Sequence, residues 1–252
     1  MENCALNGFL SPAQRARLLE AVSKRCSVRA FSDGPDVAAK SALQYAAGRL
    51  TLPGARILLE EAAPETLYRV LPAVGRVKGT RTYAAVIADD SIARSALHAG
   101  ICGEAFVLEA VSLGLGTCWI GSFKESGIEH LLLKEGERVA ALIAVGVPAQ
   151  EYQRRKRKPL SKICGGDPAS WPLWAYHAAE CVRYAPSAIN LQPWHLSFAG
   201  RTLVLEKAGF GSSLDFGIAL LHMSLGIGEK PHVIQWGKGK EIASILAEDR
   251  EL

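Results

Sequence analysis

Two expected apolar helices in this chain end in nearly the same five residues, and this repetition restricts the fold more than any other feature. Ser-Leu-Gly-Leu-Gly at 112–116 recurs as Ser-Leu-Gly-Ile-Gly at 224–228. Two further pairs of strings occur in the same order: Tyr45-Ala46 with Tyr184-Ala185, and Val145-Gly146 with Trp236-Gly237. Such a repeat predicts two similar halves, 1–165 and a shorter 166–252, which form one compact unit about a pseudo-two-fold axis. Chance similarity between short strings is the alternative.

The spacing of apolar residues predicts alternating helices and strands around these strings. Helices are expected at 12–23 with Ser11 as N-cap, at 35–47 closed by Gly48, and at 93–113, 168–184 and 214–225. Strands are expected at 55–61, 82–89, 139–148, 195–200, 202–207 and 232–237. The continuous apolar run at 139–148 is typical of a strand that is covered on both faces. Together these elements indicate an α+β or α/β fold.

The composition excludes several classes of protein. Among 252 residues, 29 are Lys or Arg and 25 are Asp or Glu, and a net charge of +4 is too small to predict nucleic-acid binding. No apolar run approaches the roughly 18–20 residues of a membrane-spanning helix, and the first residues lack the pattern of a secretion signal. Six cysteines without a Cys-x-x-Cys pair or metal-ligand spacing indicate reduced, mostly buried thiols. We therefore expect a cytoplasmic protein with no metal, nucleic-acid or membrane partner.

A first candidate for chemistry is the segment from Lys24 to Phe31, directly after the first helix. Arg25 and Arg29 flank Ser27 at even spacing, so two guanidinium groups and a hydroxyl can donate to a phosphate or a polarised carbonyl. The alternative is an ordinary helix end whose cations complement the helix dipole.

A second candidate is the segment from Ala185 to Trp194, where three polar residues lie between two prolines. Ser187, Asn190 and Gln192 place hydroxyl and amide groups on a loop that leads into a strand. Such a loop can donate to and accept from the edge of a heterocycle. A capped turn is the alternative, and it explains one of these residues more easily than three.

Two further segments are rich in glycine and in positive charge. The run Gly-Leu-Gly-Thr-Cys-Trp-Ile-Gly at 114–121 permits a tight turn and a close approach of the backbone to a flat ligand, or it is simply a helix end followed by a strand. The basic run Arg-Arg-Lys-Arg-Lys-Pro-Leu at 154–160 follows the buried strand 139–148. A solvated or nucleic-acid-binding patch is one interpretation, but the strand before it and Pro159 favour a fixed conformation.

Taken together, the four segments resemble the nitroreductase family of FMN-dependent oxidoreductases. The family carries Arg-x-Ser-x-Arg/Lys-x-Phe, Ala-Pro-Ser-x-x-Asn-x-Gln-Pro-Trp, Gly-Leu-Gly-Thr-x-Trp-Ile-Gly and a basic tail that ends Arg-x-Pro-Leu. All four patterns occur between Lys24 and Trp194. The resemblance implies an α+β nitroreductase-like fold, with mostly antiparallel sheets flanked by helices.

The order of the motifs departs from the family. In ordinary members the Pro-Ser segment precedes the Gly-Leu-Gly-Thr segment, and each FMN lies at the interface of a homodimer. Here the Pro-Ser segment comes second, while 47–53 has lost that motif and the residues 229–232 lack the Trp-Ile-Gly turn. The pattern resembles a branch in which two nitroreductase-like halves are fused into one pseudo-dimeric chain. We therefore expect one FMN per chain, one decayed second site, and a monomer or weak homo-oligomer.

The resemblance implies a role for each matched position. The phosphate of FMN would be held by Arg25, Arg155 and Arg157, with Cys26 and Ser27 beside it, and Arg29 would lie near N1 and the C2 carbonyl. The backbone of Trp119, Ile120 and Gly121 would approach N5. The other edge of the ring would be closed by Pro186, Ser187, Ala188, Asn190 and Gln192.

The implied reaction is ping-pong hydride transfer, in which NAD(P)H reduces FMN and a small-molecule acceptor such as a nitroaromatic or a quinone reoxidises it. The flavin N5 carries this chemistry, so we expect no catalytic side chain. His195, His222 and Cys118 are accordingly interpreted as structural residues. A protein that binds or stores FMN with little turnover, or a degenerate non-catalytic relative, are the alternatives.

Overall fold

The computed structural model describes residues 4, 6–61, 63–64, 67, 77–228 and 232–247. The chain forms two compact units, of which one is Lys24–Arg155 and the other combines Met1–Ser23 with Lys156–Leu252. One boundary between the units thus lies at the end of the first helix, between Ser23 and Lys24. The other lies inside the basic run, between Arg155 and Lys156. The division of the sequence at 165/166 follows the repeat instead, and it stays a prediction.

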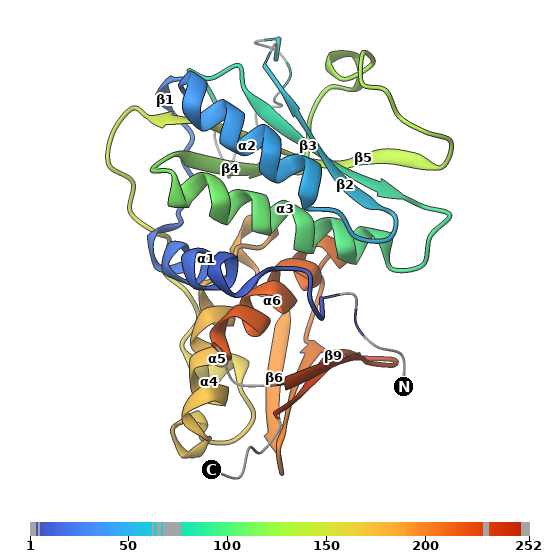
Figure 1. The fold of residues 1–252 in the computed structure, drawn as a ribbon. Coiled ribbons are helices and arrows are strands. Elements are labelled where there is room, and N and C mark those ends of the chain that lie inside the picture. Colours follow the sequence, from blue (N-terminus) through green and yellow to red (C-terminus); the bar gives the residue numbers. More distant parts are fainter. Residues whose placement is uncertain are drawn as a thin grey trace. The chain divides into compact units, whose positions relative to one another are not determined.

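The unit Lys24–Arg155 is built on an antiparallel sheet (Figure 1). Its strands are β1 (Phe31–Asp33), β2 (Ala55–Glu60), β3 (Tyr83–Asp89), β4 (Gly116–Ile120) and β5 (Glu137–Pro148). The order is β1-β5-β3-β2, and β4 also pairs with β5, from Gly116 opposite Gly146 to Ile120 opposite Leu142. The centre of β5, Ala141 to Gly146, is buried, which confirms the expected covered strand.

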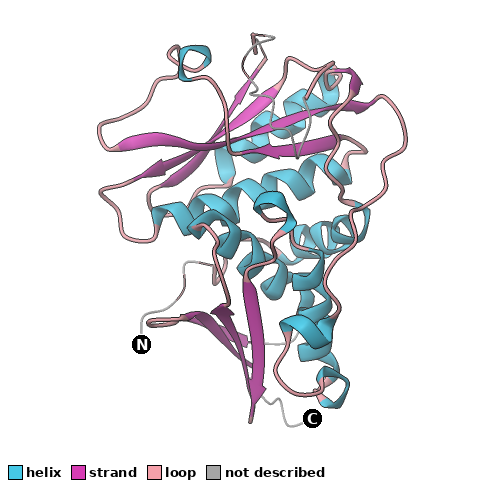
Figure 2. Ribbon diagram, turned by 180° about the vertical axis from the view of Figure 1, so that it is seen from behind, coloured by secondary structure: helices cyan, strands magenta, loops and turns pink. Residues whose placement is uncertain are grey.

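Two helices of this unit lie on one face of the sheet (Figures 1 and 2). They are α2 (Val37–Arg49) and α3 (Ser95–Ser112). Helix α3 is apolar on almost every side, and His98 to Ala110 are all buried, as expected for a helix inside a core. Two residues after its last residue, Gly114 has a positive φ of 80°, which lets the Leu115 N–H donate back to the Ala110 carbonyl, and β4 follows.

The second unit has its own four-stranded antiparallel sheet. Its strands are β6 (Trp194–Ala199), β7 (Thr202–Lys207), β8 (His232–Trp236) and β9 (Glu241–Ala247), in the order β6-β7-β9-β8. Its helices are α1 (Pro12–Lys24), α4 (Leu160–Ile163), α5 (Leu173–Tyr184) and α6 (Ser213–Gly226). Helix α1 begins at the expected N-cap, because the Gln14 N–H donates to the Ser11 hydroxyl and the Ser11 N–H donates to the Gln14 side chain. The short 3₁₀ turns of the chain are Glu125–Gly127, Pro168–Ser170 and Ala188–Asn190.

The same succession of elements occurs in both units. Helix, two strands, helix and two strands appear as α2-β2-β3-α3-β4-β5 and again as α5-β6-β7-α6-β8-β9. The strand orders β2-β3-β5-β4 and β6-β7-β9-β8 are equivalent. The strings at 112–116 and 224–228 lie at the ends of α3 and α6, which are counterparts in this succession.

One of the three paired strings was matched in the wrong register. Val145-Gly146 lies in β5, whereas Trp236-Gly237 lies at the end of β8. The strand order makes β8 the counterpart of β4 and β9 the counterpart of β5. Gly237 therefore corresponds to Gly121, the residue that follows β4.

The expected α+β class with antiparallel sheets flanked by helices is confirmed. The predicted helix at 168–184 begins only at Leu173, because Pro172 has no N–H to donate and separates it from the turn Pro168–Ser170. Gly48 does not end α2, which continues to Arg49. The strands β1 and β9 were not predicted, and β4 was expected only in the alternative interpretation of 114–121 as a helix end followed by a strand. No helix in the described residues is both long and apolar enough to cross a membrane.

Candidate functional site

The segment after α1 runs beside strand β4 of its own unit. The Val28 N–H donates to the Thr117 carbonyl at 2.8 Å, and Ser27 forms a parallel bridge with Thr117. Gly116 allows this approach, since a Cβ there would lie 2.7 Å from Val28 Cγ2. The motif therefore has an extended conformation that is held by the sheet.

In an extended segment, successive side chains point to opposite sides. Lys24, Cys26 and Val28 line a cavity of about 530 Å³ together with residues from the end of α3 and from the segment after β5. Cys26 donates to the Tyr152 carbonyl at 3.6 Å. Arg25 and Arg29 therefore lie on the side opposite to the Cys26 thiol. The odd-numbered and even-numbered residues of the motif thus face different surroundings.

Three arginines of the motifs gather around Cys118 in β4. Burial raises the pKa of the Cys118 thiol, while the charges of Arg29, Arg25 and Arg155 each act to lower it. Arg25 is only 2% exposed, and the Nε atoms of Arg25 and Arg29 are buried without a hydrogen-bond acceptor among the described residues. A buried guanidinium N–H that lacks an acceptor is unfavourable unless an anion satisfies it. The arrangement therefore fits an anionic ligand.

Glu104 in α3 is a residue of this cluster that sequence analysis missed. Its carboxylate is fully buried, Oε2 accepts from Trp119 Nε1 at 2.8 Å, and Oε1 lies 3.9 Å from Arg25 Nε. The Trp119 ring lies against Gly103, where a Cβ would be 2.3 Å from Cη2. The only sequence signal for this residue is a glutamate next to a glycine inside an apolar helix, and it was not used in the sequence analysis.

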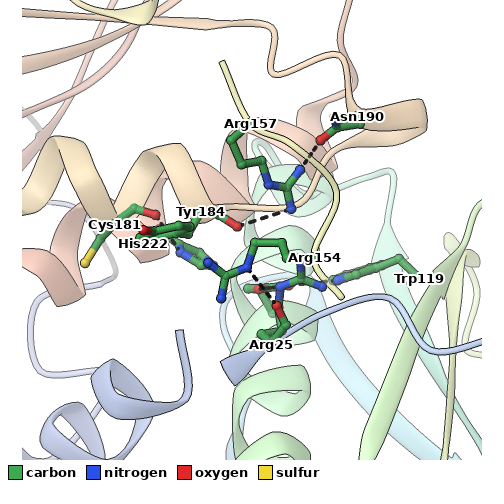
Figure 3. A network of polar contacts seen from close by, with 9 residues as sticks. Arg25, Trp119, Arg154, Arg157, Cys181, Tyr184, Asn190 and His222 are labelled. Atoms are coloured by element: carbon green, nitrogen blue, oxygen red, sulfur yellow. Dashed lines mark hydrogen bonds and ion pairs between the residues drawn. The ribbon is translucent and has the colours of Figure 1, made fainter. Parts of the chain in front are cut away.

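The basic tail is held by contacts to the first motif as far as Arg154. The Tyr152 hydroxyl accepts from the Ala30 N–H at 2.7 Å, and Arg154 Nε donates to the Arg25 carbonyl at 3.3 Å (Figure 3). Arg155 has an exposed side chain, and Gly121 at the end of β4 is also exposed. In this unit the structure thus brings Arg25, Ser27, Arg29, Trp119 and Arg155 together around β4.

In the other unit, the predicted Pro-Ser loop has an unusual backbone. Ile189, Asn190 and Gln192 have positive φ values of 44°, 64° and 48°. Such conformations cost free energy for residues other than glycine, and most for a β-branched residue, so they persist only where surrounding contacts fix them. The Ser187 hydroxyl provides one such contact by accepting from the Gln192 N–H at 2.8 Å.

The rest of the basic run contacts this loop. Arg157 donates through Nη1 to Asn190 Oδ1 and through Nη2 to the Tyr184 carbonyl at 3.4 Å (Figure 3). The Lys158 N–H donates to Gln192 Oε1 at 3.1 Å, and Asn190 Nδ2 donates to the Lys156 carbonyl at 3.1 Å. Asn190 and Gln192 therefore hold the tail with the same side chains that were predicted to bind the cofactor. Arg157 belongs with the loop, whereas Arg155 belongs with the arginines around Cys118.

Asp215 in α6 is a second residue that sequence analysis missed. It is buried, Oδ2 accepts from the Ser212 N–H and hydroxyl at 2.9 Å, and Oδ1 accepts from the Ala188 N–H at 2.8 Å. One carboxylate thus closes the capping box of α6 and also holds the predicted loop. The pattern Ser-x-x-Asp at 212–215 was the available signal.

The two histidines that were interpreted as structural occupy ordinary positions. His222 is fully buried in α6 with Nδ1 3.0 Å from the Cys181 carbonyl (Figure 3), and His195 lies in β6 with its ring near Gly165. No cluster of three or more His, Cys, Asp or Glu side chains that could bind a metal occurs in the part of the chain that the structure describes.

Comparison with known proteins decides the family. A family model described as "Putative TM nitroreductase" matches residues 17–227. The chain belongs to the nitroreductase family. This membership places it among oxidoreductases and confirms that resemblance, although the fused two-half branch remains a prediction. No curated protein matches the sequence.

Solved structures that are similar to this chain include several nitroreductases. A protein from Thermotoga maritima, described as a "putative nitroreductase", has 23% identity and a TM-score of 0.64, with 91% of this chain and 93% of that chain covered. A nitroreductase family protein from Clostridium novyi has 22% identity and a TM-score of 0.43, with 52% and 84% covered. A nitroreductase with bound FMN from Desulfitobacterium hafniense has 17% identity and a TM-score of 0.48, with 60% and 98% covered. The likeness to the Thermotoga protein supports a nitroreductase-like fold.

Proposed function

We propose that this member of the nitroreductase family is an FMN-dependent oxidoreductase that uses NAD(P)H to reduce small acceptors such as nitroaromatics or quinones. The observation that carries the proposal is the group of Arg25, Arg29 and Arg155 around buried Cys118, with two Nε donors that lack acceptors in the described residues. A cofactor that combines a phosphate with a ring that gains negative charge on reduction suits these donors.

Each arginine has a separate part in the proposal. Arg25 and Arg155 bind the phosphate, where a charge-assisted hydrogen bond contributes about 1.5–3 kcal/mol. Arg29 lies near N1 and the C2 carbonyl, where its charge favours the reduced ring. Ser27 is on the same side of the extended segment and donates to the ribityl or phosphate region. Cys26 contributes its backbone, because its thiol is directed to the opposite side.

The resemblance of the motifs supports the remaining contacts. Trp119, Ile120 and Gly121 approach the ring with their backbone, and exposed Gly121 leaves room for a flat ligand. By the same resemblance, the FMN-binding residues also include Arg157 and the loop residues Pro186, Ser187, Ala188, Asn190 and Gln192. Bound FMN supplies N5 as the atom that accepts hydride from NAD(P)H and returns it to the acceptor. The protein side chains bind and orient, and none is needed as a nucleophile.

We further propose that the chain is an internal duplication with one FMN per chain, and that it acts as a monomer or weak homo-oligomer. The equivalent strand orders of the two sheets support the duplication. The uneven distribution of the motifs supports a single FMN: the Arg-Ser-Arg segment and the Trp-Ile-Gly turn occur only in the first copy, and the Pro-Ser loop only in the second.

The test is the visible spectrum of the purified protein, with the released flavin identified and counted. We expect one FMN per chain and acceptor-dependent oxidation of NADH or NADPH. Arg29→Gln should weaken FMN binding at least tenfold, whereas Arg138→Gln in the same unit, which removes an exposed ion pair with Asp90, should leave it unchanged. Two FMN per chain would reject the single-site proposal. FMN without turnover would identify a flavin carrier, and a protein that does not bind added FMN would reject the function.

A further inference from the structure

A carboxylate in the middle of α3 has no role in the proposed chemistry and yet is fully buried. Glu104 is 0% exposed and lies in a run of buried residues from His98 to Ala110. An ionised carboxylate in such a place is costly unless it is hydrogen-bonded and paired with a cation. Its partners therefore indicate why the charge is present.

The two carboxylate oxygens of Glu104 contact residues of two different motifs. Oε2 accepts from Trp119 Nε1 at 2.8 Å, and Oε1 is 3.9 Å from Arg25 Nε, which lies on the segment after α1 (Figure 3 shows Trp119 and Arg25). The side chain of Arg25 is 2% exposed, so the attraction between the two charges is only weakly screened by water. Gly103 beside Glu104 lets the indole approach α3 closely.

Because Glu104 lies beside Arg25, its negative charge offsets part of the positive charge that the arginines offer to a bound ligand. Arg25, Arg29 and Arg155 all act on the same thiol, Cys118, and Glu104 is the carboxylate that forms an ion pair with one of them. A negative charge beside these cations raises the free energy of a bound ligand when that ligand becomes more negatively charged. The effect is largest where water is excluded.

We propose that Glu104 is a positioning residue that sets the reduction potential of the bound flavin: it orients Arg25 and Trp119 and keeps the potential low. This inference rests on the proposed FMN function. A flavin ring that takes up two electrons and one proton carries one more negative charge than the oxidised ring, so the Glu104 carboxylate disfavours this reduced form. A low potential makes the reduced protein a stronger reductant toward its acceptor.

The decisive variant is Glu104→Gln in the FMN-loaded full chain. The amide oxygen of Gln can still accept from Trp119, so the substitution removes the charge and keeps the shape. At an effective dielectric constant of about 20, the interaction of two unit charges on the order of 10 Å apart corresponds to about a tenfold change in an equilibrium. We therefore expect FMN to bind about tenfold more tightly in its reduced form relative to its oxidised form. For two electrons this corresponds to a midpoint potential about 30 mV more positive.

Glu109→Gln is the matched control, since Glu109 is a second buried carboxylate of α3 and is 7% exposed. It removes the same charge from the same helix at a position farther along α3 than the contact with Trp119. Its potential should therefore change by less than that of Glu104→Gln. Glu104→Asp keeps the charge and should retain the wild-type potential. Equal shifts in the Glu104→Gln and Glu109→Gln variants, or a shift in Glu104→Asp as large as that in Glu104→Gln, would overturn the proposal.

Glu104→Met covers the case in which the Glu104→Gln variant does not fold. Replacement of a buried charge by an apolar side chain of similar volume is often neutral or stabilising. Glu104→Met should shift the potential in the same direction as Glu104→Gln. If neither variant folds, the carboxylate is a structural requirement and the proposal is rejected. If the wild-type protein binds no FMN, the proposed function and this inference fail together, whereas an unchanged potential in FMN-loaded Glu104→Gln rejects the role of Glu104 alone.

Discussion

Gly103 in α3 provides a sharp test of the arrangement around Trp119. A Cβ on Gly103 would lie 2.3 Å from Cη2, 2.9 Å from Cζ2 and 3.2 Å from Cζ3 of that indole. Gly48 in α2 is exposed, and a Cβ there would meet nothing within 4 Å. The same substitution, Gly→Ala, can therefore be made twice in helices of one unit, once against a rigid ring and once in open space.

The two substitutions should have opposite signs. Alanine is favoured over glycine in a helix interior by about 1 kcal/mol, so Gly48→Ala should stabilise the unit by roughly 0.5–1 kcal/mol. In Gly103→Ala the same gain is opposed by overpacking, which costs about 1–3 kcal/mol. If the indole turns away instead, Glu104 loses its hydrogen bond while buried, at a cost of about 1–3 kcal/mol. We expect Gly103→Ala to be net destabilised by about 1–2 kcal/mol.

Urea unfolding followed by far-UV circular dichroism measures both free energies. Both glycines lie in the Lys24–Arg155 unit, so the two variants report on the same transition. FMN titration of each folded variant adds a second readout, in which Gly103→Ala should bind more weakly and Gly48→Ala should match the wild type.

A Gly103→Ala protein as stable as Gly48→Ala would refute this reasoning. It would mean that the Trp119 ring does not rest on α3 at this position. The link between Glu104 and Trp119, and with it the account of the potential, would then lose its geometric basis.

Three further predictions concern other parts of the molecule. Gly226→Ala should destabilise the packing of α5 on α6 by about 1–3 kcal/mol in urea unfolding, because its Cβ would lie 2.6 Å from Ala178 Cα, a backbone atom. Asp215→Ala should lower stability by about 1–2 kcal/mol and weaken FMN binding, since it removes the cap of α6 and the acceptor for the Ala188 N–H. Asp167→Ala is the control: it removes a cap on an exposed 3₁₀ turn and should leave FMN binding unchanged. The hydrogen bonds from Arg56 lower the pKa of Glu137 to about 2, so this pair stabilises the fold above the unfolded pKa near 4.5 and loses its effect as the pH falls toward 2. Glu137→Gln should therefore reduce the loss of stability between pH 4.5 and 2, and an unchanged acid transition would contradict that assignment.

The sequence predicted local features well where one residue type decides the geometry. Ser11 was predicted as an N-cap because it precedes Pro12, and proline is typical of the first helical position; the Gln14 N–H donates to its hydroxyl. The extended conformation that places Arg25, Ser27 and Arg29 on one side was not predicted, although these residues were grouped as one candidate segment.

Features that depend on distant partners were not predicted. The sequence signals the cap at Asp215 but not its contact with the Ala188 N–H. It also does not show that Glu104, inside an apolar helix, lies beside Arg25 and Trp119. The positive φ values of Ile189 and Gln192 also have no sequence signal, because neither residue favours that conformation. The register of the repeat failed at β5 and β8 because two strands that end in glycine look alike until their neighbours in the sheet are known.

The division of the chain at Ser23 and Arg155 has a consequence for how the protein is made. Helix α1 and the residues before it contact residues that are synthesised much later: Arg15 donates to the Ser224 hydroxyl at 3.0 Å, and Asn7 Nδ2 donates to the Ile234 carbonyl at 3.2 Å. Contacts between such distant residues form slowly, because closing a long loop costs entropy before the contact is gained. On the ribosome, the continuous unit Lys24–Arg155 can complete its fold first, while α1 has emerged but has no partner. The earliest residues of the chain are thus among the last to reach their final place.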